Sequence, residues 1–167
     1  MQSVTNSALW TQPGVPHRGW RCVGVEDIRP DGQPEYETEY ATCQMCGNER
    51  IRFVHMMEHS EFDGVIEAGC VCAEKMSGDY VTPRLQEGRL RKKASRKARW
   101  LSRKWRTSHK GNHFLNVDGL NLVVFPATFK PGRWSFSVDR EFSRTTYATH
   151  DEAKLALFEE FWERLSD

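Results

Sequence analysis

The chain lacks any long apolar run, because no uninterrupted stretch of apolar residues exceeds four, as in residues 122–125. A membrane-spanning helix needs about 20 such residues. The N-terminal segment MQSVTNSALW also lacks the basic region followed by an apolar region that is typical of a signal peptide. We therefore expect a cytoplasmic protein with no membrane partner.

Disulfide scaffolds are disfavoured as well, since the chain has only five cysteines, an odd number, and four of them lie within residues 43–72. Cys70 and Cys72 are separated by one residue, which is too close for an unstrained disulfide. This clustering is more typical of a metal site in a reducing compartment than of a secreted disulfide framework. The hydrophobic content of 38% and the charged content of 28% predict a folded, water-soluble protein of 167 residues.

Acidic residues are almost absent from residues 84–110, where twelve of the 24 lysines and arginines are accompanied by Glu87 alone. The rest of the chain carries the other twelve cations and 22 acids, a net charge of minus ten. A positive segment on an otherwise acidic protein favours binding to a polyanion.

The hydrophobic pattern predicts an α+β protein with a long basic helix and a C-terminal antiparallel sheet with a helix, and the cysteines indicate that its N-terminal module is zinc-binding and treble-clef-like. We expect an arm at residues 1–19, the zinc module at 20–81, a basic linker helix at 82–106 and the sheet and helix module at 107–167. In the zinc module, strands are expected at 21–28, 35–42, about 51–57 and 63–69, and a short helix begins near Cys72 and ends at Gly78.

Thr82 and Pro83 predict the start of the basic helix, and an apolar stripe from Leu90 to Trp105 extends it to about residue 105. Asp118 and Gly119 predict a tight hairpin between strands at 113–117 and 120–125, followed by a strand at 134–138. The last helix is expected after Thr149 as N-cap, with Glu152 completing a capping box.

Four cysteines form a candidate zinc site: Cys43 and Cys46 in a C-x-x-C-G turn, and Cys70 and Cys72 at the start of a helix. Zinc prefers four soft or borderline ligands in a tetrahedron, and a helix N-terminus stabilises thiolates. The pair at 70 and 72 is one residue closer than in a standard treble clef, so a site of three cysteines with His55 or His59 as fourth ligand stays open. A chain without structural metal is the third alternative.

A site closed by four protein ligands stabilises the fold and performs no chemistry, so we expect a protein that is not an enzyme. A treble clef can also support a metal-dependent nuclease of the His-Me-finger type, in which a hairpin histidine activates water. His55 has a suitable position for that role. The helix CVCAEKMSGDY lacks the asparagine and second histidine of such a site, so the nuclease is a secondary alternative.

The run C-x-x-C-G, then I-R-F-V-H and M-E-H, then G-C-V-C-A resembles a group of largely uncharacterised small zinc-finger proteins of bacteria, phages and plasmids. This resemblance covers residues 40–80. It implies a structural metal site at Cys43, Cys46 and Cys72 that Cys70 or His59 completes, and it implies no particular activity.

The C-terminal part is expected to contain three strands and a helix, with Trp134-x-Phe136 and Tyr147-x-Thr149-x-x-x-Ala153-Lys154. On these residues it more weakly resembles the sheet and helix DNA-binding domains of phage integrases and plant ethylene-response factors. The order of helix, three strands and helix also resembles double-stranded RNA-binding domains, although the lysine-bearing motif of that family is absent. This resemblance implies binding to DNA or RNA.

We therefore expect a non-enzymatic nucleic-acid-binding protein with a structural Zn²⁺ site, of phage, plasmid or bacterial origin. Its contacts should be mainly with the phosphate backbone, and an adaptor that binds an acidic host protein is the alternative. Trp100 is expected to stack on bases. The candidate nucleic-acid-binding residues are Arg89, Arg91, Lys92, Lys93, Arg96, Lys97, Arg99, Trp100, Arg103, Lys104 and Arg106.

Overall fold

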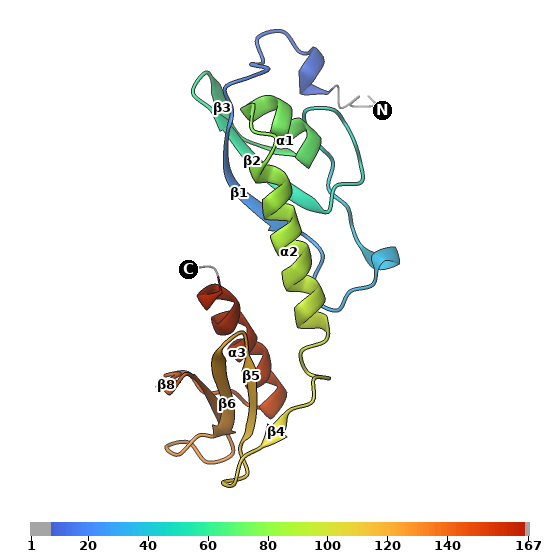
Figure 1. Ribbon diagram of the computed structural model, residues 1–167. Helices are drawn as coiled ribbons and strands as arrows, with labels where there is room; N and C mark the ends of the chain where they lie inside the picture. The colour runs from blue at the N-terminus through green and yellow to red at the C-terminus, as the bar shows by residue number, and fades with distance from the viewer. Residues whose placement is uncertain (1–7, 166–167) are drawn as a thin grey trace. The chain divides into compact units, whose positions relative to one another are not determined.

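The computed structural model describes residues 8–165, which form an α+β protein with three α-helices and two antiparallel sheets (Figure 1). The chain divides into two compact units, the first ending at Lys92 and the second beginning at Lys93. Each unit has its own hydrophobic core. Within the described part of the chain, no helix has the length and apolar character that a membrane crossing requires.

A three-stranded antiparallel sheet in the order β1-β2-β3 forms the centre of the first unit. Its strands are β1 (Arg21–Asp27), β2 (Phe53–His59) and β3 (Phe62–Ala68). Phe53, Val54 and Met57 are all buried, so both faces of β2 are covered. This explains why its sequence shows no clear apolar and polar alternation.

The helix α1 (Cys70–Ser77) follows β3 directly and ends as expected at Gly78, whose φ of 73° is the left-handed conformation of a C-cap. The core between α1 and the sheet contains Trp20, Met57 and Met76. The N-terminal segment adds the short 3-10 helix η1 (Leu9–Thr11), which packs on this core through Leu9.

The strand expected at residues 35–42 does not form, and this prediction was wrong. The segment begins with the 3-10 helix η2 (Glu35–Glu37), and only Ala41 pairs with a neighbour, Ile51. Tyr36 is 86% exposed. The alternation of tyrosine and glutamate indicated a strand, but Tyr36 has no apolar surface to pack against.

The basic helix α2 (Thr82–Ala98) starts at the expected residue but ends seven residues before Trp105. It buries only Pro83, and Ala98 of the expected apolar stripe is exposed. After Ala98 the chain turns, because Trp100 enters the core of the second unit. The apolar spacing continued across this turn by coincidence.

The second unit contains a five-stranded antiparallel sheet in the order β4-β5-β6-β7-β8. The hairpin between β5 and β6 forms as expected, with Asp118 and Gly119 at φ values of 51° and 80°. Such positive values at both positions define a type I′ turn. The strands are β4 (Arg106–Thr107), β5 (His113–Val117), β6 (Leu120–Pro126), β7 (Trp134–Val138) and β8 (Glu141–Phe142).

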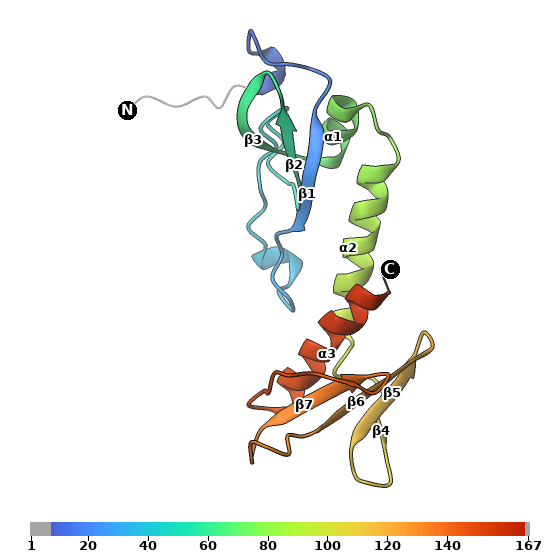
Figure 2. The ribbon, with the colours of Figure 1, turned by 90° about the vertical axis from the view of Figure 1, so that its left-hand side faces the viewer.

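The helix α3 (His150–Arg164) lies across one face of this sheet (Figure 2). Thr149 caps it, because its side-chain oxygen accepts a 3.1 Å hydrogen bond from the Glu152 amide. Glu152 accepts in return from the Ala148 amide at 3.0 Å, one residue before the position in a standard capping box. Leu157, Phe158 and Phe161 of α3 are fully buried against the sheet.

Candidate metal centre

The turn that carries Cys43 and Cys46 is closed by its own backbone. The Gly47 amide donates a 2.7 Å hydrogen bond to the Cys43 carbonyl, and the Cys43 amide donates to the Asn48 carbonyl at 2.8 Å. Gly47 has a φ of 78°, which a residue with a side chain rarely adopts. The turn therefore holds the two sulfurs on the same side of the chain.

Cys72 reaches this turn from the first turn of α1. Gly69 precedes the helix, and a side chain at that position would come within 2.7 Å of the Ile51 Cδ1 atom. The absence of a side chain lets the helix start lie close to the turn, where the Gly69 amide donates to the Cys43 sulfur at 3.4 Å. The Trp10 indole donates to the Cys72 sulfur at the same distance.

The sulfur atoms of Cys43, Cys46 and Cys72 lie within 4.8 Å of one another. Sulfurs around a tetrahedral zinc ion are about 3.8 Å apart, given a zinc to sulfur distance of about 2.3 Å. This upper limit is compatible with three sulfurs that share one zinc ion. Cys43 and Cys72 are buried, whereas Cys46 is exposed.

The electrostatics of this group favour metal binding. The Cys72 thiol donates a hydrogen bond to Cys43, and with the Gly69 amide this lowers the pKa of Cys43 to about 5. The same partnership raises the pKa of Cys72, because its proton is shared with the Cys43 thiolate. Three convergent sulfurs with N–H donors aimed at two of them are a donor set that suits Zn²⁺.

Cys70 does not face this group. It lies with His55 and Glu87 in a second group whose donor atoms are within 4.8 Å of one another. Burial raises the pKa of the Cys70 thiol to about 11, with help from the Glu87 and Glu74 carboxylates. The structure thus brings together three of the four cysteines proposed as ligands of one ion.

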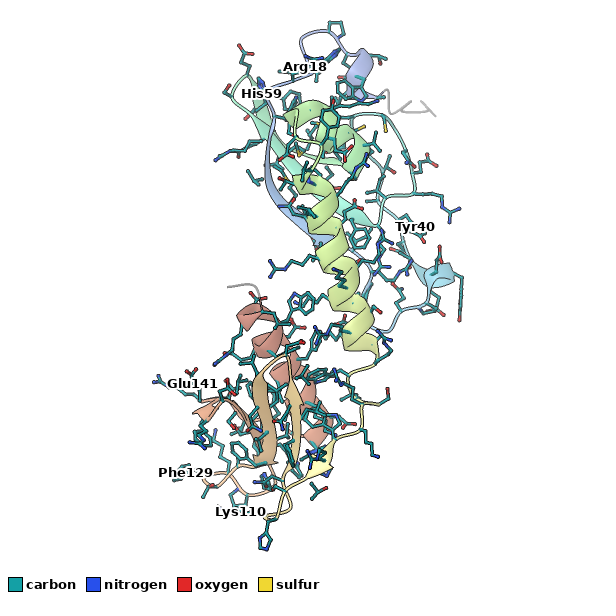
Figure 3. All side chains as sticks on the ribbon, in the orientation of Figure 1. Arg18, Tyr40, His59, Lys110, Phe129 and Glu141 are labelled. Atoms are coloured by element: carbon teal, nitrogen blue, oxygen red, sulfur yellow. The ribbon has the colours of Figure 1, made fainter. Side chains whose placement is uncertain are left out.

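Neither histidine considered as fourth ligand joins the three sulfurs. His59, labelled in Figure 3, packs its ring against Trp20 at 5.3 Å, and its Nδ1 atom accepts a 3.0 Å hydrogen bond from the Glu61 amide. His55 is fully buried with its Nε2 atom 3.1 Å from the Glu87 carboxylate. Within residues 8–165, no histidine, cysteine or carboxylate joins the three-sulfur group as a fourth ligand.

The three cysteines line a cavity of about 450 Å³ in the first unit. Cys70 and Glu87 line the same cavity, and four arginines contribute to its polar wall: Arg29, Arg50, Arg52 and Arg91. Arg52 is held by Asp27 through two hydrogen bonds of 2.8 and 2.7 Å. Nothing in the sequence pattern had indicated this cavity. A metal ion on the three sulfurs would have its fourth position available to a small ligand.

His55 is poorly placed for the water activation that a nuclease requires. Its side chain has no exposed surface and is absent from the lining of the cavity. A general base must reach the proton that it removes directly or through one water molecule. The geometry therefore gives no support to a catalytic role of His55.

The proposed nucleic-acid-binding residues divide into three groups. Four cations of α2 have carboxylate partners: Arg91 with Glu87 at 3.9 Å, Lys93 and Lys97 with Glu159, and Arg96 with Asp118 at 2.7 Å. Six other cations are exposed and have no carboxylate partner among residues 8–165: Arg89, Lys92, Arg99, Arg103, Lys104 and Arg106.

Trp100 forms the third group alone, and its expected stacking on bases was wrong. Its side chain is fully buried in the core of the second unit, and its indole donates a 2.7 Å hydrogen bond to the Lys154 carbonyl. Trp105 packs edge to face against Trp100, with ring centroids 5.7 Å apart. The two tryptophans anchor the chain on either side of Arg103 and Lys104.

No protein-family model, curated protein or solved structure matches this chain. The function of the protein is therefore inferred from the arrangement of the described residues.

Proposed function

We propose that this protein is a non-enzymatic nucleic-acid-binding protein. In this proposal, Zn²⁺ bound by Cys43, Cys46 and Cys72 stabilises the first unit. The contacts with phosphates are made by residues 99–106 of the second unit, which we call the basic segment.

One observation carries the proposal: the basic segment presents four exposed cations without a carboxylate partner in residues 8–165. These are Arg99, Arg103, Lys104 and Arg106, and the segment itself contains no acidic residue. Arg99 and Arg103 also line, with Arg96, a hollow of about 350 Å³. Phosphate oxygens are suitable partners for such cations, because each contact releases a condensed counterion.

The buried tryptophans support this role by holding the segment in place. Trp100 and Trp105 fix the backbone at two points, so the cations between them lose less freedom when they bind. Arg106 is also positioned over the Phe114 ring at 5.1 Å. A charged segment held in this way favours backbone contacts without base recognition.

The test is the affinity for short duplex and single-stranded DNA and RNA, measured by fluorescence anisotropy at several salt concentrations. The variant Arg103→Gln/Lys104→Gln should bind more weakly than the parent protein. Its slope of log affinity against log salt concentration should be smaller by about 1.8 for duplex DNA, since each phosphate contact contributes about 0.9.

The matched control is Lys130→Gln/Arg144→Gln, which removes two exposed cations elsewhere in the same unit. This control should retain the parent slope. Equal slopes for the two double variants would show that the basic segment is not the contact surface. If the parent protein binds no nucleic acid at about 50 mM salt, where phosphate contacts are strong, the proposal fails and an acidic protein becomes the better candidate partner.

A further inference from the structure

Three metal-binding side chains of the first unit converge outside the three-cysteine group. They are His55 from the middle of β2, Cys70 from the first position of α1 and Glu87 from α2. Their donor atoms lie within 4.8 Å of one another. Each comes from a different element, so the fold itself creates the group.

The C-x-C spacing explains why Cys70 and Cys72 belong to different groups. Successive residues of an α-helix are rotated by about 100° around the helix axis. Residues i and i+2, such as Cys70 and Cys72, are therefore rotated by about 200° relative to each other. Both cysteines lie in the first turn of α1. Their sulfurs therefore face different points, and the spacing that is unusual for one zinc site suits two.

Excess negative charge surrounds the Cys70 thiol. The thiol donates to the Glu74 carboxylate at 3.9 Å, and Glu87 is the second carboxylate in the group. Glu74 forms an ion pair with Arg84, whereas the nearest cation to Glu87, Arg91, is 3.9 Å away. His55 is fully buried and its Nδ1 atom has no hydrogen-bond partner in the described structure. A bound cation would compensate the charge of the thiolate and the Glu87 carboxylate.

We propose that His55, Cys70 and Glu87 bind a second divalent metal ion, separate from the ion at Cys43, Cys46 and Cys72. A set of one imidazole, one thiolate and one carboxylate suits Zn²⁺ best among common divalent ions. Cys70 and Glu87 line the 450 Å³ cavity, which leaves the fourth position of this ion accessible to water.

The second ion would join the start of α2 to the sheet and to α1. This helix needs such a link because Pro83 is its only buried residue. The polar contacts of this half of α2 with its neighbours include the ion pair between Arg84 and Glu74 and the 3.1 Å contact between Glu87 and His55. The pair between Arg91 and Glu87 lies within the helix, and such solvent-exposed pairs stabilise little. Occupation of the site would therefore order the first half of α2.

The experiment measures zinc bound per chain by elemental analysis of the full chain, after equilibration with Zn²⁺ and gel filtration. We expect two ions for the parent protein and one for both Glu87→Gln and Cys70→Ser. The control Cys22→Ser should retain two, since Cys22 belongs to neither group. The Glu87 side chain is 19% exposed, and Glu87→Gln keeps its size, so we expect the fold to be preserved, which circular dichroism checks.

Cobalt substitution distinguishes the two sites by their sulfur content. The thiolate to cobalt charge-transfer absorbance should rise for the first equivalent, bound by three thiolates, and about a third as much for the second. Glu87→Gln should lose only the smaller step. The proposal is overturned if the parent protein binds a single ion and Glu87→Gln still binds it. It is also overturned if the parent protein binds one ion and Cys70→Ser binds none, because Cys70 would then be a ligand of the first site. Neither result depends on nucleic-acid binding.

Discussion

Cys72 and Cys22 are two cysteines of the first unit that differ in whether they belong to the metal centre. Cys72 is buried next to Cys43, and its sulfur accepts the Trp10 indole hydrogen bond. Cys22 is only partly buried, and its thiol donates to the Gly24 carbonyl at 3.3 Å. These two residues are therefore a matched pair for testing whether a metal stabilises the fold.

We expect Cys72→Ser to abolish zinc binding by the three-cysteine group and to lower the free energy of unfolding by about 3 kcal/mol or more. The reason is that the binding free energy of a structural zinc ion is part of the folding free energy. Urea denaturation in the presence of Zn²⁺ measures the change. Cys22→Ser should cost less than about 1 kcal/mol, and equal losses in the two variants would argue against a metal contribution.

His150 predicts a dependence of stability on pH. Burial lowers its pKa, as do the nearby charges of Lys154 and His113, while Asp151 acts in the opposite direction. Below the ordinary histidine pKa of about 6.5, His150 is therefore protonated in the unfolded chain but less readily protonated in the folded protein. The free energy of unfolding should fall as the pH decreases from about 6.5 through the pKa of the folded state.

This prediction is checked by urea denaturation between pH 7.5 and 5.5. His150→Gln should show a smaller decrease in unfolding free energy than the parent protein over this interval. His109→Gln, at an exposed loop position, is the control and should retain the parent slope. Identical slopes in the parent and His150→Gln would exclude the contribution of this residue.

At the scale of single elements, the α3 cap is the clearest case in which a short motif determines structure. Thr149 accepts a hydrogen bond from the amide of Glu152, a group that otherwise has no partner at a helix start. Thr149→Ala should lower the free energy of unfolding of the second unit by about 1 kcal/mol. Thermal denaturation measures the loss, and Thr145→Ala, another exposed threonine of this unit, should be nearly neutral.

Elements with strong local signals could be predicted from the sequence. The β5 to β6 hairpin, the cap of α3 and the C-terminal end of α1 each depend on residues within a few positions, such as Asp118, Thr149 and Gly78. The end of α2 could not be predicted, because it depends on Trp100 entering a core formed by β6, β7 and α3. Local periodicity contains no information about that core.

The candidate metal centre was predictable only in part for a similar reason. The spacing of the cysteines predicted Cys43, Cys46, Cys70 and Cys72 as ligands of one ion, but it did not show that Cys70 belongs to a different group. The second group requires Glu87, which lies 17 residues after Cys70 and resembles an ordinary surface acid in the sequence. Ligands brought together by the fold leave no spacing pattern.

At the scale of the whole molecule, the two hydrophobic cores differ in what stabilises them. The first core includes Cys43 and Cys72, whereas the second contains no cysteine and is rich in aromatic residues such as Trp100 and Phe158. A large apolar core is stabilised by burial alone, while a small one depends more on its metal.

Removal of metal should therefore affect one unit and not the other. We expect a strong zinc chelator to broaden or shift the amide resonances of residues 20–80 in a two-dimensional NMR spectrum, and to leave those of residues 113–165 in place. Readdition of Zn²⁺ should restore the spectrum. Uniform changes in both units, or no change in either, would contradict the separate stabilisation of the two cores.

The contact between Trp10 and the Cys72 sulfur, which spans 62 residues of sequence, has an optical consequence. A free thiol or thiolate beside an indole quenches its fluorescence, and coordination to Zn²⁺ occupies the electron pair responsible. The emission of Trp10 thus reports directly on occupancy of the nearby sulfurs, without an added dye. Subtracting the spectrum of Trp10→Phe from that of the parent isolates this signal from the other five tryptophans.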